Sequence, residues 1–267
     1  MASTGTWTQA LASIGAVPVR WLAGWWNIVE FGAIVLVLAM SPSSYRAGVG
    51  PALARHVYMD TAPILGWFTA LCALLTLVLT RIVVVTAYSY GLSQYALEMV
   101  IRVLVLELIP LTAALFVALR CTIPNGAALA QMRRAGQFDA LRRQGVDPMA
   151  REVLPRVIAG VFSTITLAAL SCVVALALAY LAVYGTTTAG IAVYTRMFGH
   201  VFTPPVALIF VLKTLFFSLA VSVIPMASAL YDLEGDGSRE SAALQGLVRM
   251  FAVLLLIESV SLVGNYY

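Results

Sequence analysis

Long apolar runs separated by short polar connections dominate the chain. Five of these runs are near or above the ~20 residues that a helix needs to cross ~30 Å of hydrocarbon. Their apolar positions are continuous, whereas the strands of a membrane barrel would alternate over ~10 residues. The pattern therefore predicts an all-α integral membrane protein with spans at residues 62–88, 95–119, 157–184, 204–230 and 242–263.

An earlier apolar run, residues 21–40, is also long enough to span, but it has Glu30 at its middle and three tryptophans near its start. Tryptophan prefers the membrane interface, and an amphipathic helix can lie in that plane. We therefore predict an N-terminal interfacial helix, with a further span as the alternative. This helix and a polar cytoplasmic linker form a first unit, residues 1–60, before a permease domain of residues 61–267.

Composition and charge support a membrane location and indicate an orientation. Hydrophobic residues make up 61% of the chain and charged residues only 10%, against about 25% charged residues in soluble domains. The net charge of +4 does not indicate a nucleic-acid partner, because seven of the sixteen basic residues lie in one connection. The positive-inside rule places that connection and the N-terminus in the cytoplasm and the C-terminus outside. Its basic residues are Arg120, Arg133, Arg134, Arg142, Arg143, Arg151 and Arg156.

Five charged residues lie inside the first, second and fourth predicted spans, where each costs about 2.5–3.5 kcal/mol on insertion scales. Lys213 is near the middle of the fourth span and needs a partner; Glu107 on the second span is the candidate, with a water-lined cavity as the alternative. Glu98 and Arg102 are four residues apart and can pair on one helix face. Arg81 lies near the outer end of the first span, where it either reaches the headgroups or lines a cavity.

Nothing in the sequence indicates catalysis by this chain. The motif G-x-x-x-x-G-K-[ST] is absent, and Lys213 is the only lysine. Neither a Ser/His/Asp set nor a metal-ligand spacing is present, and the three cysteines are far apart. We therefore predict a transport subunit, not an enzyme, with no cofactor or metal of its own.

A series of short motifs begins in the second predicted span and runs through the basic connection. These motifs are Leu106-Glu107-Leu108-Ile109-Pro110, Arg120, Gln131-Met132-Arg133, Gly136-Gln137-Phe138-Asp139-Ala140-Leu141, Gly145-Val146-Asp147-Pro148 and Pro155-Arg156. In order and spacing they resemble the MlaE (YrbE) family of permeases, which has R-E-x-G-P, G-R, E-x-G-x-M-x-x-x-E-Q-I-D-A-L, G-V-D-P and P-R. Lys213 also falls in a segment similar to the family's K-S/T-x-x-F pattern.

Several positions depart from the family pattern, so the chain resembles a divergent member. Leu106 stands in place of an arginine, and Ala128 and Gly136 stand in place of acidic residues. Pro124 and Asn125 interrupt a stretch where the family has small residues. Arg102, one helical turn before Leu106, is a candidate to replace the missing arginine as a ligand for lipid phosphate. The alternative is a structural pair with Glu98.

The resemblance implies a permease subunit of an Mce-associated ABC lipid transporter in the bacterial inner membrane. It implies an ABC ATPase that carries ATP and magnesium, an Mce-domain (MlaD-like) protein, a STAS-domain (MlaB-like) regulator and a second permease copy or paralogue. The cargo would be phospholipid. Two hypotheses from other classes remain: an ion-coupled secondary transporter that acts alone, and a membrane scaffold that transports nothing.

The resemblance also assigns roles to particular residues. A coupling segment at about residues 121–156 would transmit the movement of the ATPase, with a short surface helix over Gln131–Asp147; the alternative is a solvated basic loop. Glycine prefers helix C-termini, so Gly136 and Gly145 are expected to mark helix ends. The expected coupling residues are Met132, Gln137, Phe138, Asp139, Leu141 and Asp147. The expected cavity between the first two spans and their mates has polar groups Arg81, Glu98, Arg102, Glu107 and Lys213 and apolar groups such as Leu77, Leu79 and Val84.

Overall fold

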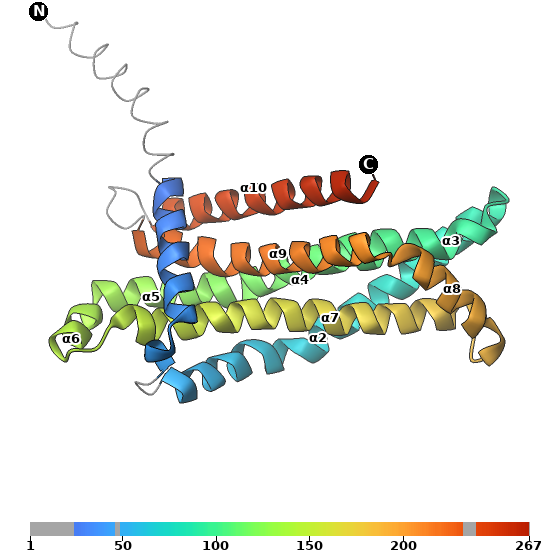
Figure 1. Ribbon diagram of the computed structural model, residues 1–267. Coiled ribbons are helices and arrows are strands. Elements are labelled where there is room, and N and C mark those ends of the chain that lie inside the picture. Colours follow the sequence, from blue (N-terminus) through green and yellow to red (C-terminus); the bar gives the residue numbers. More distant parts are fainter. Residues whose placement is uncertain (1–23, 46–48, 232–238, 267) are drawn as a thin grey trace, which may run out of the picture.

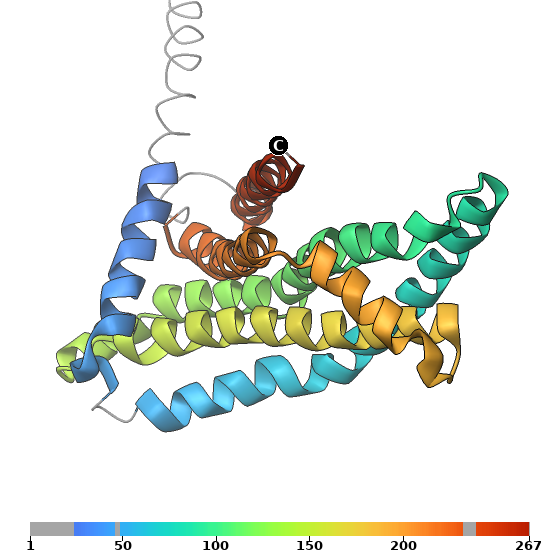
Figure 2. The same cartoon turned by 45° about the vertical axis from the view of Figure 1, so that its right-hand side comes forward.

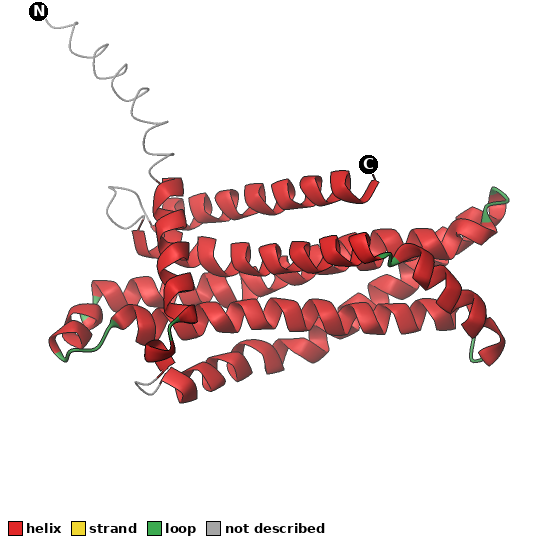
Figure 3. Ribbon diagram, viewed as in Figure 1, coloured by secondary structure: helices red, strands yellow, loops and turns green. Residues whose placement is uncertain are grey.

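The computed structural model describes residues 24–45, 49–231 and 239–266. Within these ranges every regular element is a helix (Figure 3). Five of the described helical segments are long and apolar enough to cross a membrane. They are Val49–Ser89, Tyr95–Arg134, Met149–Tyr184, Pro204–Tyr231 and Leu244–Asn265. The predicted number of spans is thereby confirmed, and all five begin earlier or end later than the apolar runs that predicted them.

The second span is one long helix whose winding changes along its length. It passes through α3 (Ser93–Val100), the π-helical η2 (Ile101–Leu108), α4 (Ile109–Val117), the π-helical η3 (Ala118–Thr122) and α5 (Ile123–Arg134). The third span begins in the same way, with the π-helical η4 (Met149–Val153) before α7 (Leu154–Tyr184).

Each of these π-helical stretches ends two residues before a proline, at Pro110, Pro124 and Pro155. A proline inside an α-helix has no N–H to donate, and its ring collides with the carbonyl four residues earlier. A widened turn accommodates both effects without ending the helix. The second span can therefore continue through Pro110 and Pro124, and the third through Pro155, without a break in the helix.

The N-terminal helix Gly24–Met40 runs across the long helices instead of along them (Figures 1 and 2). Ile28, Phe31 and Val35 on one face are buried in the main core. On the other face Trp26 is 71% exposed, and Val29 is exposed as well. A short helix that crosses the bundle and presents tryptophan outward fits the predicted interfacial position, and it is not among the helices long enough to span.

The expected linker before residue 61 contains more helix than we expected, and so does the connection between the third and fourth spans. After the 3₁₀ turn Pro42–Tyr45, helix α2 (Val49–Ser89) begins well before residue 60, so much of the predicted linker is helical. Pro51 falls in the first turn of α2, where its missing N–H needs no partner. The connection after α7 likewise contains η5 (Thr188–Gly190) and α8 (Ile191–Val201).

Helix α7 lies at the centre of the molecule and packs against α2 and α9 (Pro204–Tyr231). The largest fully buried side chains include Phe31, Leu154 and Phe217. Helix α10 (Arg239–Tyr266) packs on α9 at the edge of the bundle (Figure 2). Its outer face is apolar and exposed, through Leu244, Val248, Phe251, Leu255, Leu256 and Val260.

Candidate functional site

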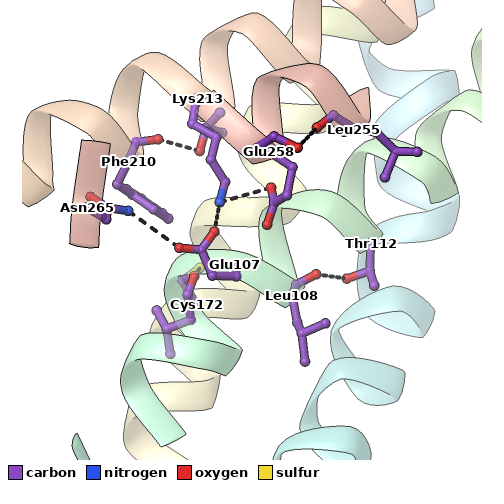
Figure 4. Close-up of polar contacts among 12 residues, drawn as sticks. Glu107, Leu108, Thr112, Cys172, Phe210, Lys213, Leu255, Glu258 and Asn265 are labelled. Atoms are coloured by element: carbon purple, nitrogen blue, oxygen red, sulfur yellow. Dashed lines mark hydrogen bonds and ion pairs between the residues drawn. The ribbon is translucent and has the colours of Figure 1, made fainter. Parts of the chain in front are cut away.

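A cluster of charged side chains is buried where three helical segments meet (Figure 4). Lys213 of α9 is 3% exposed, and its ammonium donates a hydrogen bond to Glu107 of η2. The same ammonium lies 3.1 Å from a carboxylate oxygen of Glu258 on α10. The amide of Asn265 donates to the other Glu107 oxygen at 3.4 Å. The expected pairing of Lys213 with Glu107 is confirmed, and the structure adds two residues of α10 to it.

This arrangement stabilises ionisable groups in a place where an isolated charge would be costly. A lone charge at the membrane centre is expensive, and breaking a buried pair leaves an uncompensated charge that costs about 3–5 kcal/mol. Here one ammonium lies between two carboxylates, so removing either carboxylate still leaves the ammonium a partner. Removing the ammonium would leave both carboxylates without a cation among the described residues.

A cavity of about 430 Å³ opens beside this cluster, between α9 and α10. Its volume is within the ~300–1,000 Å³ of small-molecule sites. Apart from Lys213 and Ser261 its wall is apolar, so it suits a hydrocarbon chain whose polar end lies near the charged cluster. The lining residues are Ile209, Leu212, Lys213, Phe216, Leu256, Ile257, Val260, Ser261 and Gly264.

The expected cavity stays a prediction, because it would lie between two copies of the chain. We expected it along the first two spans and their mates, with apolar side chains such as Leu77, Leu79 and Val84. Leu77 is exposed, and Leu79 packs against the core cluster that η2 and α7 share. Within a single described chain, the hollow next to Lys213 is bounded by the fourth and fifth spans instead.

The other three ionisable residues are separate from the buried cluster. Arg102 donates to Glu98 at 3.0 Å, so the expected intrahelical pair is present. Both side chains are about one-third exposed, with values of 29% and 32%. Arg81 is exposed on α2. Within one chain, the five expected cavity groups therefore lie in three places: the Lys213–Glu107 pair, the Glu98–Arg102 pair and Arg81.

The expected coupling segment contains two helices, so the single helix over Gln131–Asp147 was wrong. Helix α5 ends at Arg134, and α6 follows as a separate helix, Gln137–Arg143. Gly136 and Gly145 have φ of 71° and 74°, the left-handed conformation that glycine adopts without strain. They flank α6, so the prediction that they mark helix boundaries is confirmed.

The side chains of this segment divide into anchors and exposed groups. Phe138 is 7% exposed and belongs to the main core, against which Met132 also packs. Leu141 is half-buried, whereas Gln137, Asp139 and Asp147 are exposed. The Asp147 carboxylate accepts a hydrogen bond from the Met149 backbone N–H at 3.0 Å. The segment is thus a platform fixed to the bundle by apolar anchors, with polar groups toward solvent.

Glu258 and Asn265 are the members of the cluster that we did not predict. Both lie on the last span, and Glu258 was detectable as an isolated carboxylate inside an apolar run. Lys213 already had a candidate partner, so there was no reason in the sequence to expect a second one. Whether Glu258 reaches Lys213 depends on the distance between α9 and α10, which only the fold determines.

Comparison with known proteins agrees with the fold. The family model described as Permease MlaE matches residues 53–263. No curated protein matches the chain as a relative. The matched region extends from the first part of α2 almost to the end of α10, and so includes every member of the charged cluster except Asn265. The chain belongs to the MlaE permease family.

Proposed function

We propose that this protein is the permease subunit of an ATP-driven transporter that moves phospholipid, or a similar amphiphile, across the bacterial cell envelope. It acts in the inner membrane, with its N-terminus in the cytoplasm and its C-terminus in the periplasm. An ABC ATPase supplies ATP hydrolysis, and an Mce-domain protein exchanges lipid with the outer side. A STAS-domain regulator and a second permease copy or paralogue complete the assembly.

The observation that supports this function best is the apolar cavity beside a buried charged cluster. An acyl chain fits a wall made of residues such as Leu212, Phe216 and Val260. A headgroup at the edge of the cavity meets Lys213, whose charge is balanced by Glu107 and Glu258. In a site with apolar walls and few polar groups, the walls give affinity for the ligand and the polar groups fix its orientation.

The exposed apolar face of α10 supports the second permease copy. In the single chain this face leaves Leu256 and Val260 uncovered at the cavity, and Val248 uncovered earlier on α10. A mate packed there would bury them and enclose the lipid between two subunits. Lipid alone can also cover such a face, because hydrocarbon is as apolar as leucine; measuring the oligomeric state distinguishes the two.

Coupling to the ATPase is assigned to α5 and α6. Their apolar anchors Met132 and Phe138 join them to the core, and Gln137 and Asp139 are free to contact a cytoplasmic partner. A platform fixed in this way transmits a push to the spans, which a loose loop cannot do. An ion-coupled mechanism is less favoured, because Arg81 and the Glu98–Arg102 pair do not contact the Lys213 cluster through any interaction among the described side chains.

The test is to purify the tagged full-length protein from its native host in mild detergent and to identify co-purifying proteins and lipids by mass spectrometry. We expect an ATPase, an Mce-domain protein and phospholipid. A chain that is recovered without an ATPase or lipid would overturn the proposal and favour a transporter that acts alone.

A further inference from the structure

Asn125 lies in the coupling segment, and its side chain contacts another span. Its amide donates a hydrogen bond to the carboxylate of Asp60 on α2 at 2.9 Å. The thiol of Cys121, one turn earlier, donates to the backbone carbonyl of Asp60 at 3.3 Å. Both Asp60 and Asn125 are half-buried, so water screens this contact only in part.

Helix α5 is also fastened to α9, which carries Lys213. Thr122, at the junction with α5, donates to the Val221 carbonyl at 2.6 Å. Arg133, near the other end of α5, donates to the Leu230 carbonyl at 2.7 Å. Gly126 faces α9 so closely that a Cβ there would lie 3.1 Å from the Pro225 carbonyl oxygen. A displacement of α5 therefore passes directly to α9.

The connection from α5 to α2 is of a different kind. Helix α2 packs mainly along α7, whereas α5 packs mainly along α9. Thr61, next to Asp60, shares a hydrogen bond of 2.6 Å with Ser163, which fastens α2 to α7. Asp60 thus lies where the first span is tied to α7 on one side and to α5 on the other.

Two charged or titratable side chains lie near Asp60 besides its bond to Asn125. His56 lies one turn earlier on α2, and Arg156 of α7 acts electrostatically on both His56 and Asp60. Arg156 is itself held by Glu152 at 2.9 Å and approaches the Met132 sulfur at 3.8 Å. The contact is therefore part of a small network that links α2, the coupling segment and the start of α7.

We propose that the Asp60–Asn125 hydrogen bond positions the first span so that it moves together with the coupling segment. Without it, a push from the ATPase on α6 would still reach α9 through α5, but it would reach α2 less directly, through Cys121 and through α7. This inference rests on the proposed function and adds a mechanical contact between α2 and α5. Asp60 and Asn125 are positioning residues in this scheme, and neither lines the cavity beside Lys213.

The test compares lipid transfer with ATP hydrolysis in the complete complex, reconstituted in phospholipid vesicles. Asn125→Asp places two carboxylates opposite each other, and we expect the lipid moved per ATP hydrolysed to fall by about tenfold, as for loss of a hydrogen bond to a charged group. ATP hydrolysis itself stays within about twofold, because the anchors of α6 are intact. The exchange Asp60→Asn with Asn125→Asp restores an amide–carboxylate pair and should restore the ratio.

Thr61→Val is the matched control, since it removes an interhelical hydrogen bond of the neighbouring residue that does not reach α5. It should lower thermal stability without lowering the lipid moved per ATP. Three results would overturn the inference. Asn125→Asp could lower lipid transfer and ATP hydrolysis equally, or the exchange variant could fail to restore the lipid moved per ATP. Thr61→Val could also lower the lipid moved per ATP as much as Asn125→Asp does. Failure of the proposed function shows separately, as a wild-type complex that contains no ATPase or moves no lipid.

Discussion

The carboxylate of Glu258 on α10 lies 3.1 Å from the ammonium of Lys213 on α9. This ion pair holds the last span to the fourth beside the cavity that the two helices bound. The same ammonium is bonded to Glu107 on the second span, so one cation joins three segments of the bundle. Changes at these positions should therefore affect both stability and ligand binding, and the two effects can be separated.

Replacing Lys213 by methionine should destabilise the protein by about 3–5 kcal/mol, because two buried carboxylates lose their cation. Adding Glu107→Gln and Glu258→Gln to that variant removes the unpaired charges and should recover most of the thermal stability in detergent. Bound phospholipid, measured by mass spectrometry, should stay reduced in the triple variant. Normal lipid content in the triple variant would show that the charged cluster is structural only.

The two carboxylates should differ in their contributions. Glu107 is bonded to both Lys213 and Asn265, whereas Glu258 has an ion pair with Lys213. Glu107→Gln should therefore lower the melting temperature more than Glu258→Gln, since hydrogen bonds to charged groups contribute about 1.5–3 kcal/mol each. Thermal unfolding of the two variants in the same detergent makes the comparison. A larger loss for Glu258→Gln would contradict the arrangement of partners described here.

Gly160→Ala should destabilise the bundle by overpacking. A Cβ at Gly160 would lie 2.7 Å from the Ser222 hydroxyl and 2.9 Å from a Thr122 methyl group, and overpacking of this kind costs about 1–3 kcal/mol. Gly66→Ala is the control, because a Cβ there meets no atom within 4 Å. Gly66→Ala should leave the free energy of unfolding unchanged or raise it by about 0.5–1 kcal/mol, because alanine has a higher helix propensity than glycine. Similar melting temperatures for the two variants would argue against the close α7–α9 contact.

Substitutions at two neighbouring residues of the coupling platform should have different effects, one on stability and the other on ATPase binding. Phe138→Ala should lower stability by about 3–5 kcal/mol, because a buried aromatic ring leaves a cavity. Asp139→Ala should leave the melting temperature unchanged, since the side chain is exposed, and should reduce the amount of ATPase that co-purifies. If Asp139→Ala and a change at exposed Arg142 both left the ATPase yield intact, the docking surface would lie elsewhere.

The proposed orientation places α6 and α8 on opposite sides of the membrane. In a background without the native cysteines, Gln137→Cys should react with an impermeant thiol reagent only after the inner membrane is opened. Ile191→Cys at the start of α8 should react once the reagent reaches the periplasm, because Ile191 is exposed. Reversed accessibility would invert the topology and move the ATPase contact to the other end of the bundle.

Local features of the sequence accounted for the spans and for several contacts within them. The length and continuity of the apolar runs predicted five spans, because the hydrocarbon thickness fixes how many apolar residues a helix needs. The spacing of Glu98 and Arg102 predicted their pair, and Gly136 and Gly145 indicated the ends of α6. Even the partner of Lys213 could be predicted, because a buried ammonium requires a carboxylate and few were available in the membrane.

The tertiary structure alone decided which side chains from different helices meet. Whether Glu258 reaches Lys213, and whether Asn125 reaches Asp60, depends on the rotation and register of whole helices. The π-helical turns before Pro110 and Pro124 change that rotation within the second span, so helical spacing cannot be carried across them. Insertion into a membrane depends on the composition of each segment by itself, whereas the cavity and the charged cluster depend on how several segments pack together.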